Sequence, residues 1–258
     1  MQTHGKSVGF IESLALSQYD EKASSVDKTA FYKVVASRRA VRQFSKDRIP
    51  GPVFSRVIKA AILAPSSSNM QLWHFIRVKD SAVKKQLAHF CLDQPAATTA
   101  AEIIAVIARP SLWKKHRDQL LSLVQKDGNT ARVKYYKHII PMAYSHGPCS
   151  IAGLGKWLFV SVAGIFRPVP RGPFSNKGVQ IVAIKSAALA AENIMLALRA
   201  EGFDSCPMEA FDELRAKRLL RLKASDRVVM LIAAGERAKH GVLSPRVRFP
   251  LNETISEF

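Results

Sequence analysis

The sequence predicts a single domain of the α+β or mixed α/β class. Two observations lead to this prediction. Several segments carry apolar residues at helical spacing, and short continuous apolar runs, typical of buried strands, lie between them. In addition, 48% of the 258 residues are hydrophobic, so the chain can bury a sizeable core. The expected order is helix, helix, strand, helical region, strand, insertion, central helix and strand.

The start of the chain is expected to be flexible. Residues 1–25 are polar and show little periodicity, which predicts a flexible segment before a single domain at 26–258. The domain begins with a predicted helix at Thr29–Arg38, in which three apolar residues share one side: Phe31, Val34 and Val35.

A second helix and two strands follow. Gly51-Pro52 opens the helix, because proline is favoured at a first helical position, and Pro65 ends it. The strand candidates are Trp73–Val78 and Glu102–Ala108, of which the second is apolar after Glu102 and therefore expected to be buried.

The second half of the chain is less regular. Residues from about 110 to 178 hold basic, aromatic and proline-rich stretches, which indicate an insertion and not a second domain. Ile184–Glu201 predicts a long helix that stops at Gly202. This helix is apolar on most faces, so it should be buried on several sides and meet a partner subunit. A last buried strand is expected at Arg227–Ala234.

The stretch IAGLGKWLFVSVAGIF, Ile151–Phe166, is strongly apolar. It is shorter than the roughly 20 residues that span a bilayer, and Lys156 interrupts it. A buried or dimer-facing segment is therefore expected, and membrane contact is not.

The net charge of +19, from 39 basic and 20 acidic residues, favours anionic ligands. The basic residues are spread along the chain, and no nucleic-acid-binding motif stands out, so no nucleic acid partner is expected. The three cysteines are too few and too far apart for a disulfide framework or a zinc site. With no secretory signal at the N-terminus, these features predict a cytoplasmic protein without a metal.

Two familiar catalytic signatures are incomplete. Gly153-Leu154-Gly155 lacks the third glycine of a dinucleotide-binding loop and has no strand just before it. His146 and Cys149 lie close in sequence, but no third residue can be assigned to a nucleophilic dyad, so a loop histidine and a packed cysteine are the preferred interpretation.

Two clusters of arginines are candidate anion sites. In SRRAVRQF, Ser37–Phe44, the apolar Val41 and Phe44 should anchor the segment to the core and hold its arginines in place: Arg38, Arg39 and Arg42. In SPRVRFPLNE, an extended chain would put Arg246 and Arg248 on one side and the apolar Val247 and Phe249 on the other. Fixed, mutually repelling guanidinium groups are best satisfied by an anion such as phosphate, although a solvated basic surface is the alternative.

A row of small polar residues forms the third candidate. In APSSSNMQLWHF, Ala64–Phe75, the side chains of Ser66, Ser67 and Asn69 can bond the polar edges of a ligand. The alternative is a helix C-terminal turn that satisfies its own hydrogen bonds.

Taken in order, SRRAVRQF, APSSSNMQLWHF, CPMEAFD (206–212) and RVRFP (246–250) resemble the nitroreductase family of FMN-dependent oxidoreductases. The resemblance covers roughly residues 30–108 and 182–258. It implies a nitroreductase-like α+β fold, with a central mixed or antiparallel sheet flanked by helices and a lid-like insertion, and it implies a homodimer.

The resemblance also assigns roles to residues. Arg38 and Arg39 match the positions that hold the FMN phosphate, as do Arg246 and Arg248 near the C-terminus. Arg42 matches the basic residue beside the flavin pyrimidine. Ser66, Ser67 and Asn69 match the loop that reaches the partner's flavin. Met208 and Glu209 match the segment whose main-chain N–H faces flavin N5.

Three positions depart from the family pattern. Ala40 stands where the family often has serine, Leu72 replaces a proline before the tryptophan, and Ala210 stands where glycine often follows the glutamate. None of these changes removes a charge that phosphate binding requires, but Ala210 is expected to alter the main chain near flavin N5.

The function that the resemblance implies is transfer of hydride from NADH or NADPH, through FMN, to a small electron acceptor such as a nitroaromatic or a quinone. Because the flavin carries the chemistry, no catalytic side chain is assigned. Three alternatives on the same fold are ene reduction, reductive dehalogenation and flavin-consuming oxidation. A non-catalytic flavin- or anion-binding protein is the alternative of another class.

Overall fold

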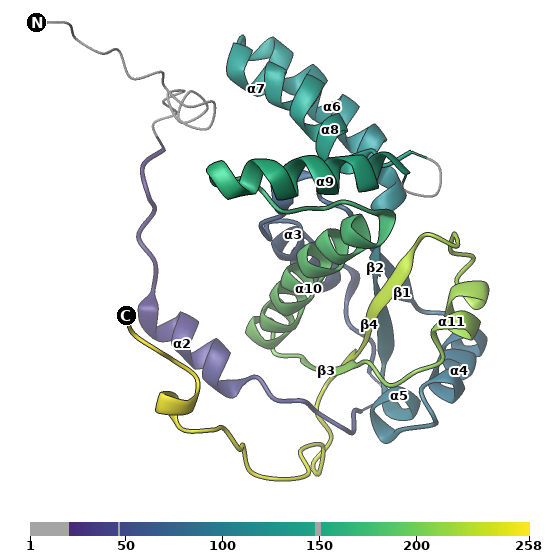
Figure 1. Ribbon diagram of the computed structural model, residues 1–258. Helices are drawn as coiled ribbons and strands as arrows, with labels where there is room; N and C mark the ends of the chain where they lie inside the picture. The colour runs from purple at the N-terminus through teal and green to yellow at the C-terminus, as the bar shows by residue number, and fades with distance from the viewer. Residues whose placement is uncertain (1–20, 46, 148–150) are drawn as a thin grey trace, which may run out of the picture.

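The computed structural model describes residues 21–45, 47–147 and 151–258, and the predicted flexibility of residues 1–20 concerns a part outside them. The chain has the α+β fold that the sequence predicts. Its centre is an antiparallel sheet of four strands in the order β1-β2-β4-β3 (Figure 1). The strands are β1 (Trp73–Val78), β2 (Glu102–Ala108), β3 (Asp204–Met208) and β4 (Arg227–Gly235).

Successive side chains of β2 pack alternately into two cores, one on each face of the sheet. Ile104 and Val106 join the core beneath α3 (Gly51–Ala61) and α10 (Asn176–Ala200). Ile103 and Ile107 join the core beneath the helices on the other face, namely α4 (Ser81–Phe90), α5 (Pro95–Thr99) and α11 (Glu213–Leu219). Every residue of β2 is buried, which is why this strand reads as a continuous apolar run and not as an alternating one.

The strand β3 is the one that the sequence analysis did not predict. Its sequence DSCPM contains no alternation of apolar and polar residues, and Pro207 cannot donate a ladder hydrogen bond. The strand lies at the edge of the sheet, where it pairs only with β4, and an edge tolerates proline. Tertiary pairing therefore overrides a weak local preference here.

The remaining helices lie before and within the insertion. The helix α2 (Lys28–Ser37) forms as predicted, although none of its residues is buried. The predicted insertion is itself helical, and α10 starts eight residues earlier than expected because Ser175 caps it through a bond from Gly178 N to Ser175 Oγ (3.1 Å). The insertion contains α6 (Trp113–Lys126), α7 (Thr130–Lys134), α8 (Ile140–Tyr144) and α9 (Ile151–Phe166). The short helical segments of the chain are η1 (Ser67–Asn69), η2 (Pro110–Leu112), η3 (Tyr135–Ile139) and η5 (Leu251–Glu253).

The burial predicted for Ile151–Phe166 is wrong within one subunit. This segment forms the helix α9, of which Gly153 is the buried residue. Figure 1 shows α9 between α10 and the group α6, α7 and α8, away from the sheet. Its apolar composition predicted burial, but the helix approaches the protein closely at Gly153 and Gly164, while its large apolar side chains stay exposed. Whether it faces a partner subunit stays a prediction.

Among the described residues, one helix is long and apolar enough to cross a membrane, and that helix is α10. Its residues Ala187, Ala190 and Ile194 are fully buried against the sheet, which is typical of the core helix of a globular domain.

Candidate functional site

The segment SRRAVRQF is anchored to the core, as the sequence predicts, and it lies against the edge of the sheet. Val41 and Phe44 are buried, and Val41 N donates to Ser205 O of β3 at 3.0 Å. Bridges join Ala40 to Ser205 and Phe44 to Arg237. The main chain is therefore held at Arg42, which lies between these anchors, and next to Arg39, which directly precedes them.

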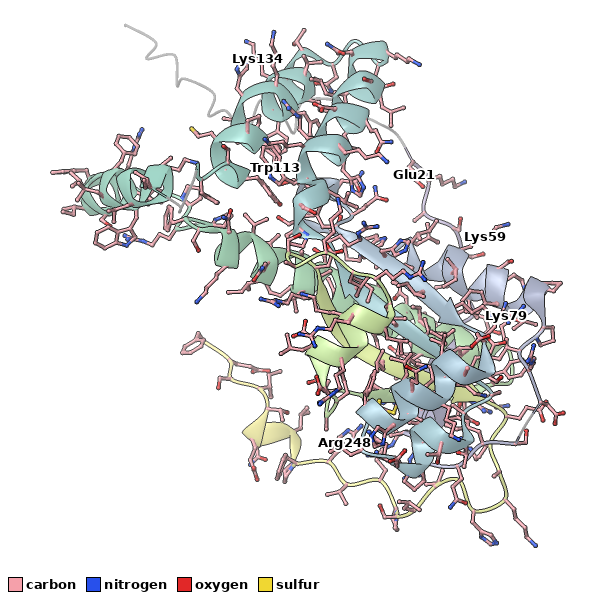
Figure 2. The ribbon with its side chains drawn as sticks, turned by 90° about the vertical axis from the view of Figure 1, so that its right-hand side faces the viewer. Glu21, Lys59, Lys79, Trp113, Lys134 and Arg248 are labelled. Atoms are coloured by element: carbon pink, nitrogen blue, oxygen red, sulfur yellow. The ribbon has the colours of Figure 1, made fainter. Side chains whose placement is uncertain are left out.

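The C-terminal segment lies beside SRRAVRQF, although more than 200 residues separate the two in sequence. Arg39 Nη2 donates to Ser244 O at 2.5 Å, and Arg246 donates to the carbonyl of Arg38. Figure 2 shows Arg248 at the side of the molecule where the C-terminal segment runs past the body. The two segments enclose a cavity of about 320 Å³ whose lining includes all five predicted arginines: Arg38, Arg39, Arg42, Arg246 and Arg248.

This cavity, here called the arginine cavity, has no acidic residue in its lining. The pKa of Arg246 is lowered, first by desolvation and then by repulsion from Arg248, Arg39 and Arg38. Glu192 lies outside the lining, with its Oε1 atom 3.8 Å from Arg38 Nε. An anion that accepts several guanidinium bonds would relieve this repulsion.

Val247 and Phe249 are exposed and pack on no core. The alternation of arginine and apolar residues in RVRFP therefore does not anchor the segment. The bonds of Arg39 and Arg246 to main-chain carbonyls hold it instead.

The Ser66–Asn69 loop combines local hydrogen bonds with free polar groups. Ser66 Oγ accepts from Gln71 N at 3.0 Å, and Tyr136 donates its hydroxyl to Ser68 O at 3.1 Å. Ser67 and Asn69 are exposed, and Asn69 has a φ of 53°, which is uncommon for a residue other than glycine. Ser66 thus serves the turn itself, and Asn69 Oδ1 also accepts from Gln71 Nε2 at 3.1 Å, while Ser67 is exposed.

The structure does not bring this loop to the arginine cavity of the same chain. Ser66 and Ser67 line a separate cavity of about 230 Å³ with Val182 and Leu189 of α10, and Asn69 lines a third cavity beside α6. This separation is what a loop that serves the partner's cofactor would require, and that role stays a prediction.

Met208 and Glu209 lie at the end of β3. Met208 is 2% exposed and packs in the core with Val41, whereas Glu209 is exposed. Phe211 N donates to Glu209 O at 3.1 Å, which turns the chain towards α11. Ala210 has no positive φ, so this turn does not need the glycine that the family often has there.

A buried carboxylate that sequence reasoning missed ties these segments together. Asp204 is 3% exposed and accepts bonds from Arg237 Nη2 at 2.7 Å and from Arg199 Nη1 at 3.2 Å. Arg199 Nε also donates to Ser37 Oγ, just before the first arginine of the cavity. No local pattern marks Asp204, because its partners come from α10 and from the chain after β4.

A family comparison decides the assignment. The model of the nitroreductase family matches residues 35–236, which is more than half of the chain. The chain belongs to the nitroreductase family. The matched range contains SRRAVRQF, the Ser66–Asn69 loop and Glu209, but it ends before Arg246 and Arg248.

Known nitroreductase-family proteins agree with this assignment along most of their length. The NADH dehydrogenase of Thermus thermophilus is 25% identical over 229 residues, which cover 88% of this chain and 94% of the relative. The fold matches that of ydfN from Bacillus subtilis with a TM-score of 0.68 at 22% identity, covering 90% of this chain and 100% of the other. It also matches a protein from Exiguobacterium sibiricum solved in complex with FMN, with a TM-score of 0.62, 22% identity and coverage of 92% and 100%.

The two described cysteines of this nitroreductase-family chain are unsuited to nucleophilic chemistry. Burial raises the pKa of Cys91 to about 11 and also raises the pKa of Cys206, so both remain thiols at neutral pH. Cys149 lies outside the described residues. His146 is buried, with a pKa lowered by desolvation and by Lys156.

Proposed function

We propose that this nitroreductase-family enzyme transfers hydride from NADH or NADPH, through FMN, to a nitroaromatic, a quinone or a similar acceptor. The observation that carries the proposal is the arginine cavity, where five guanidinium groups from two distant segments surround about 320 Å³. Names of relatives support the same reaction class: an NADH dehydrogenase, an NAD(P)H nitroreductase of Bacillus subtilis and a 4-nitrobenzoate reductase of Pseudomonas putida.

The residues present fit FMN. A terminal phosphate carries about two negative charges, and the arginine cavity offers several N–H donors with no competing carboxylate in its lining. We assign the phosphate to Arg38, Arg39, Arg246 and Arg248. An FAD would place a second nucleotide where FMN has a free phosphate, and this cluster of charges favours the free phosphate.

The other predicted residues position the ring. Arg42 Nη1 donates to Gln94 Oε1 at 3.3 Å, which fixes a positive charge for the flavin pyrimidine. The main chain of Met208 and Glu209 would face flavin N5, and Ser66, Ser67 and Asn69 of one subunit would bond the flavin of the other. When bound, the flavin supplies hydride transfer at N5. The protein contributes orientation, a positive field that favours the anionic reduced ring, and a fixed pocket.

The test has two steps on the purified protein. First, the bound cofactor is released by heat and identified, and we expect about one FMN per subunit, as one arginine cavity per chain holds one phosphate. Second, NADH and NADPH are added without air, followed by nitroaromatic, quinone, enone and halogenated acceptors. Bleaching by a nicotinamide and recovery by a nitroaromatic or quinone are expected.

Other outcomes would redirect the proposal. A colourless protein that takes up no FMN on titration would overturn it. Bound FMN that neither NADH nor NADPH reduces would indicate a non-catalytic flavin-binding protein. Recovery by only an enone or a halogenated compound would assign ene reduction or dehalogenation on the same fold.

A further inference from the structure

The helix α9 has its apolar side chains on the outside. Trp157 is 51% exposed and Phe166 is 82% exposed, and the same helix exposes six further large apolar residues: Ile151, Leu154, Leu158, Phe159, Val162 and Ile165. In Figure 2, α9 is the helix that extends away from the rest of the molecule, with side chains standing out around it. Eight exposed large apolar residues within 16 form a continuous patch, which signals an interaction surface and not an ordinary protein exterior.

The side of α9 that faces the protein is small and polar. A Cβ atom at Gly153 would lie 1.8 Å from Phe174 O, so only glycine permits this close approach. Lys156, the one charged residue of the helix, donates to the carbonyls of Met142 and Ser145 at the end of α8. These contacts fix the orientation of α9. Rotating the helix to bury its apolar side chains would take Lys156 away from its two carbonyl acceptors.

The chain around α9 is uniformly cationic. Residues 128–191 contain eight lysines and arginines and no aspartate or glutamate. Arg171 packs over Gly164 of α9, where its guanidinium would lie 2.6 Å from an added Cβ. Arg167 directly follows the helix, and it is exposed together with Arg171 and Lys177.

We propose that α9 and its basic flanks dock on the surface of an anionic lipid bilayer. A helix of 16 residues is about 24 Å long, shorter than the roughly 30 Å hydrocarbon core. The helix therefore lies in the interface and does not span the bilayer. Exposed aromatic and aliphatic side chains enter the boundary between headgroups and acyl chains, while Lys and Arg bind anionic headgroups. This proposal revises the expectation that the segment avoids membrane.

A second copy of the chain is the other conceivable occupant, and the charges disfavour it. A two-fold symmetric contact brings two copies of the same patch together, so it would add the positive charge of Arg167, Arg171 and Lys177 twice to one interface. Residues 128–191 offer no carboxylate to compensate them. An anionic lipid surface meets both requirements of the patch, namely apolar cover and negative charge.

Vesicle flotation with the full chain tests the apolar part. The probes are vesicles of phosphatidylcholine alone and vesicles of phosphatidylcholine mixed with phosphatidylglycerol. Wild type should float with the mixed vesicles and much less with the neutral ones. The variant Phe159→Ser/Phe166→Ser should lose at least about tenfold in partitioning, because it removes two apolar side chains that the bilayer would bury. The control Leu92→Ser/Leu214→Ser, which changes exposed residues outside α9, should bind like wild type.

The charged part has its own variant. Arg167→Gln/Arg171→Gln/Lys177→Gln should lower partitioning into mixed vesicles by about a hundredfold, at about fivefold per basic residue. The control Lys79→Gln/Lys85→Gln/Lys239→Gln removes the same charge from exposed positions elsewhere and should keep most of the binding. Thermal unfolding of all variants confirms that they fold.

Trp157 provides a direct readout. Trp73 is buried in the core and Trp113 is half-buried, so a blue shift of fluorescence on adding mixed vesicles should vanish in Trp157→Phe. The proposal would be overturned if the wild type did not bind mixed vesicles, or if the α9 variants bound them as well as the wild type does. If Phe159→Ser/Phe166→Ser instead converted a dimer to a monomer in light scattering, a second copy would be the occupant and the proposal would be wrong.

Discussion

Arginine side chains serve two different purposes in this chain. Arg77 and Arg237 are saturated by buried carboxylates, with Arg77 Nε 2.5 Å from Glu102 Oε2 and Arg237 Nη2 2.7 Å from Asp204 Oδ1. The arginines of the cavity lack a buried carboxylate: Arg39 and Arg246 donate to main-chain carbonyls, Arg42 donates to Gln94, and Arg38 lies 3.8 Å from the exposed Glu192. The first kind should govern stability and the second kind cofactor binding.

Removing one arginine from the cavity should weaken FMN binding. For Arg38→Ala or Arg248→Ala we expect a loss of about 2–4 kcal/mol, as for losing one partner of a charge-assisted bond. Fluorescence titration with FMN measures the affinity, and Arg218→Ala, at an exposed position of α11, is the control. Unchanged affinity in both cavity variants would mean that these arginines are only a solvated surface.

Removing a buried partner should instead cost stability. Arg77 also donates to Ile49 O at 2.6 Å and lies 4.1 Å from the centre of the Phe54 ring, so it ties α3 to β1. Arg77→Ala leaves Glu102 buried without its partner and should lower the free energy of unfolding by about 3–5 kcal/mol.

Chemical denaturation with urea measures this cost. The control is Arg56→Ala, which breaks the exposed pair with Glu201 and should lower the free energy of unfolding much less, because solvent screens an exposed ion pair. Equal losses in the two variants would contradict the distinction between the buried and the exposed pair.

The elements that the sequence predicts well are those whose pattern is decided locally. The strands β1, β2 and β4 are apolar runs bounded by turns, and they form within one residue of their predicted ends. The strand β3 and the helix α9 are decided by what they touch. The first is held by pairing with β4, and the second leaves its apolar side exposed. The composition of a segment predicts that it is buried, but it does not indicate which neighbouring element or molecule buries it.

In the Ser66–Asn69 loop, side chains that are predicted to bind FMN stand beside one that shapes the turn. Ser67→Ala/Asn69→Ala should lower FMN affinity, and its smaller loss of stability should come from Asn69, whose φ of 53° disfavours alanine and whose Oδ1 accepts from Gln71 Nε2. Ser66→Ala removes the acceptor of Gln71 N and should cost about 1 kcal/mol of stability. FMN titration and thermal unfolding, run on both variants, distinguish the roles. A double variant that loses stability but keeps its FMN affinity would assign the whole row to an ordinary turn.

For the molecule as a whole, sequence reasoning found the charges of the candidate site but not what holds them. Arg38, Arg39 and Arg42 form a recognisable cluster. Asp204 and Gln94, which fix its surroundings, are isolated residues: Asp204 binds Arg199 and the more distant Arg237, and Gln94 binds Arg42, which lies 52 residues before it. Side chains that act through tertiary contacts leave no local pattern, so only the structure reveals them.

The separation of the loop from the arginine cavity leads to a last prediction, that the working molecule is a dimer. Leu189 of α10 is half exposed and lines the same cavity as Ser66 and Ser67, so an exposed apolar residue and the loop that is predicted to bind the cofactor belong to one surface. If that surface meets a partner, FMN bound between subunits should raise the stability of the dimer by mass action.

Light scattering at micromolar concentration, with and without FMN, measures this assembly. Leu189→Asp should shift the dimer to a monomer and lower FMN affinity together, since it puts a charge into the contact and separates the loop from the partner's cavity. Leu214→Asp, on the exposed side of α11, should change neither. A holo-protein that runs as a monomer with full flavin content and full activity would show that one chain builds the site alone.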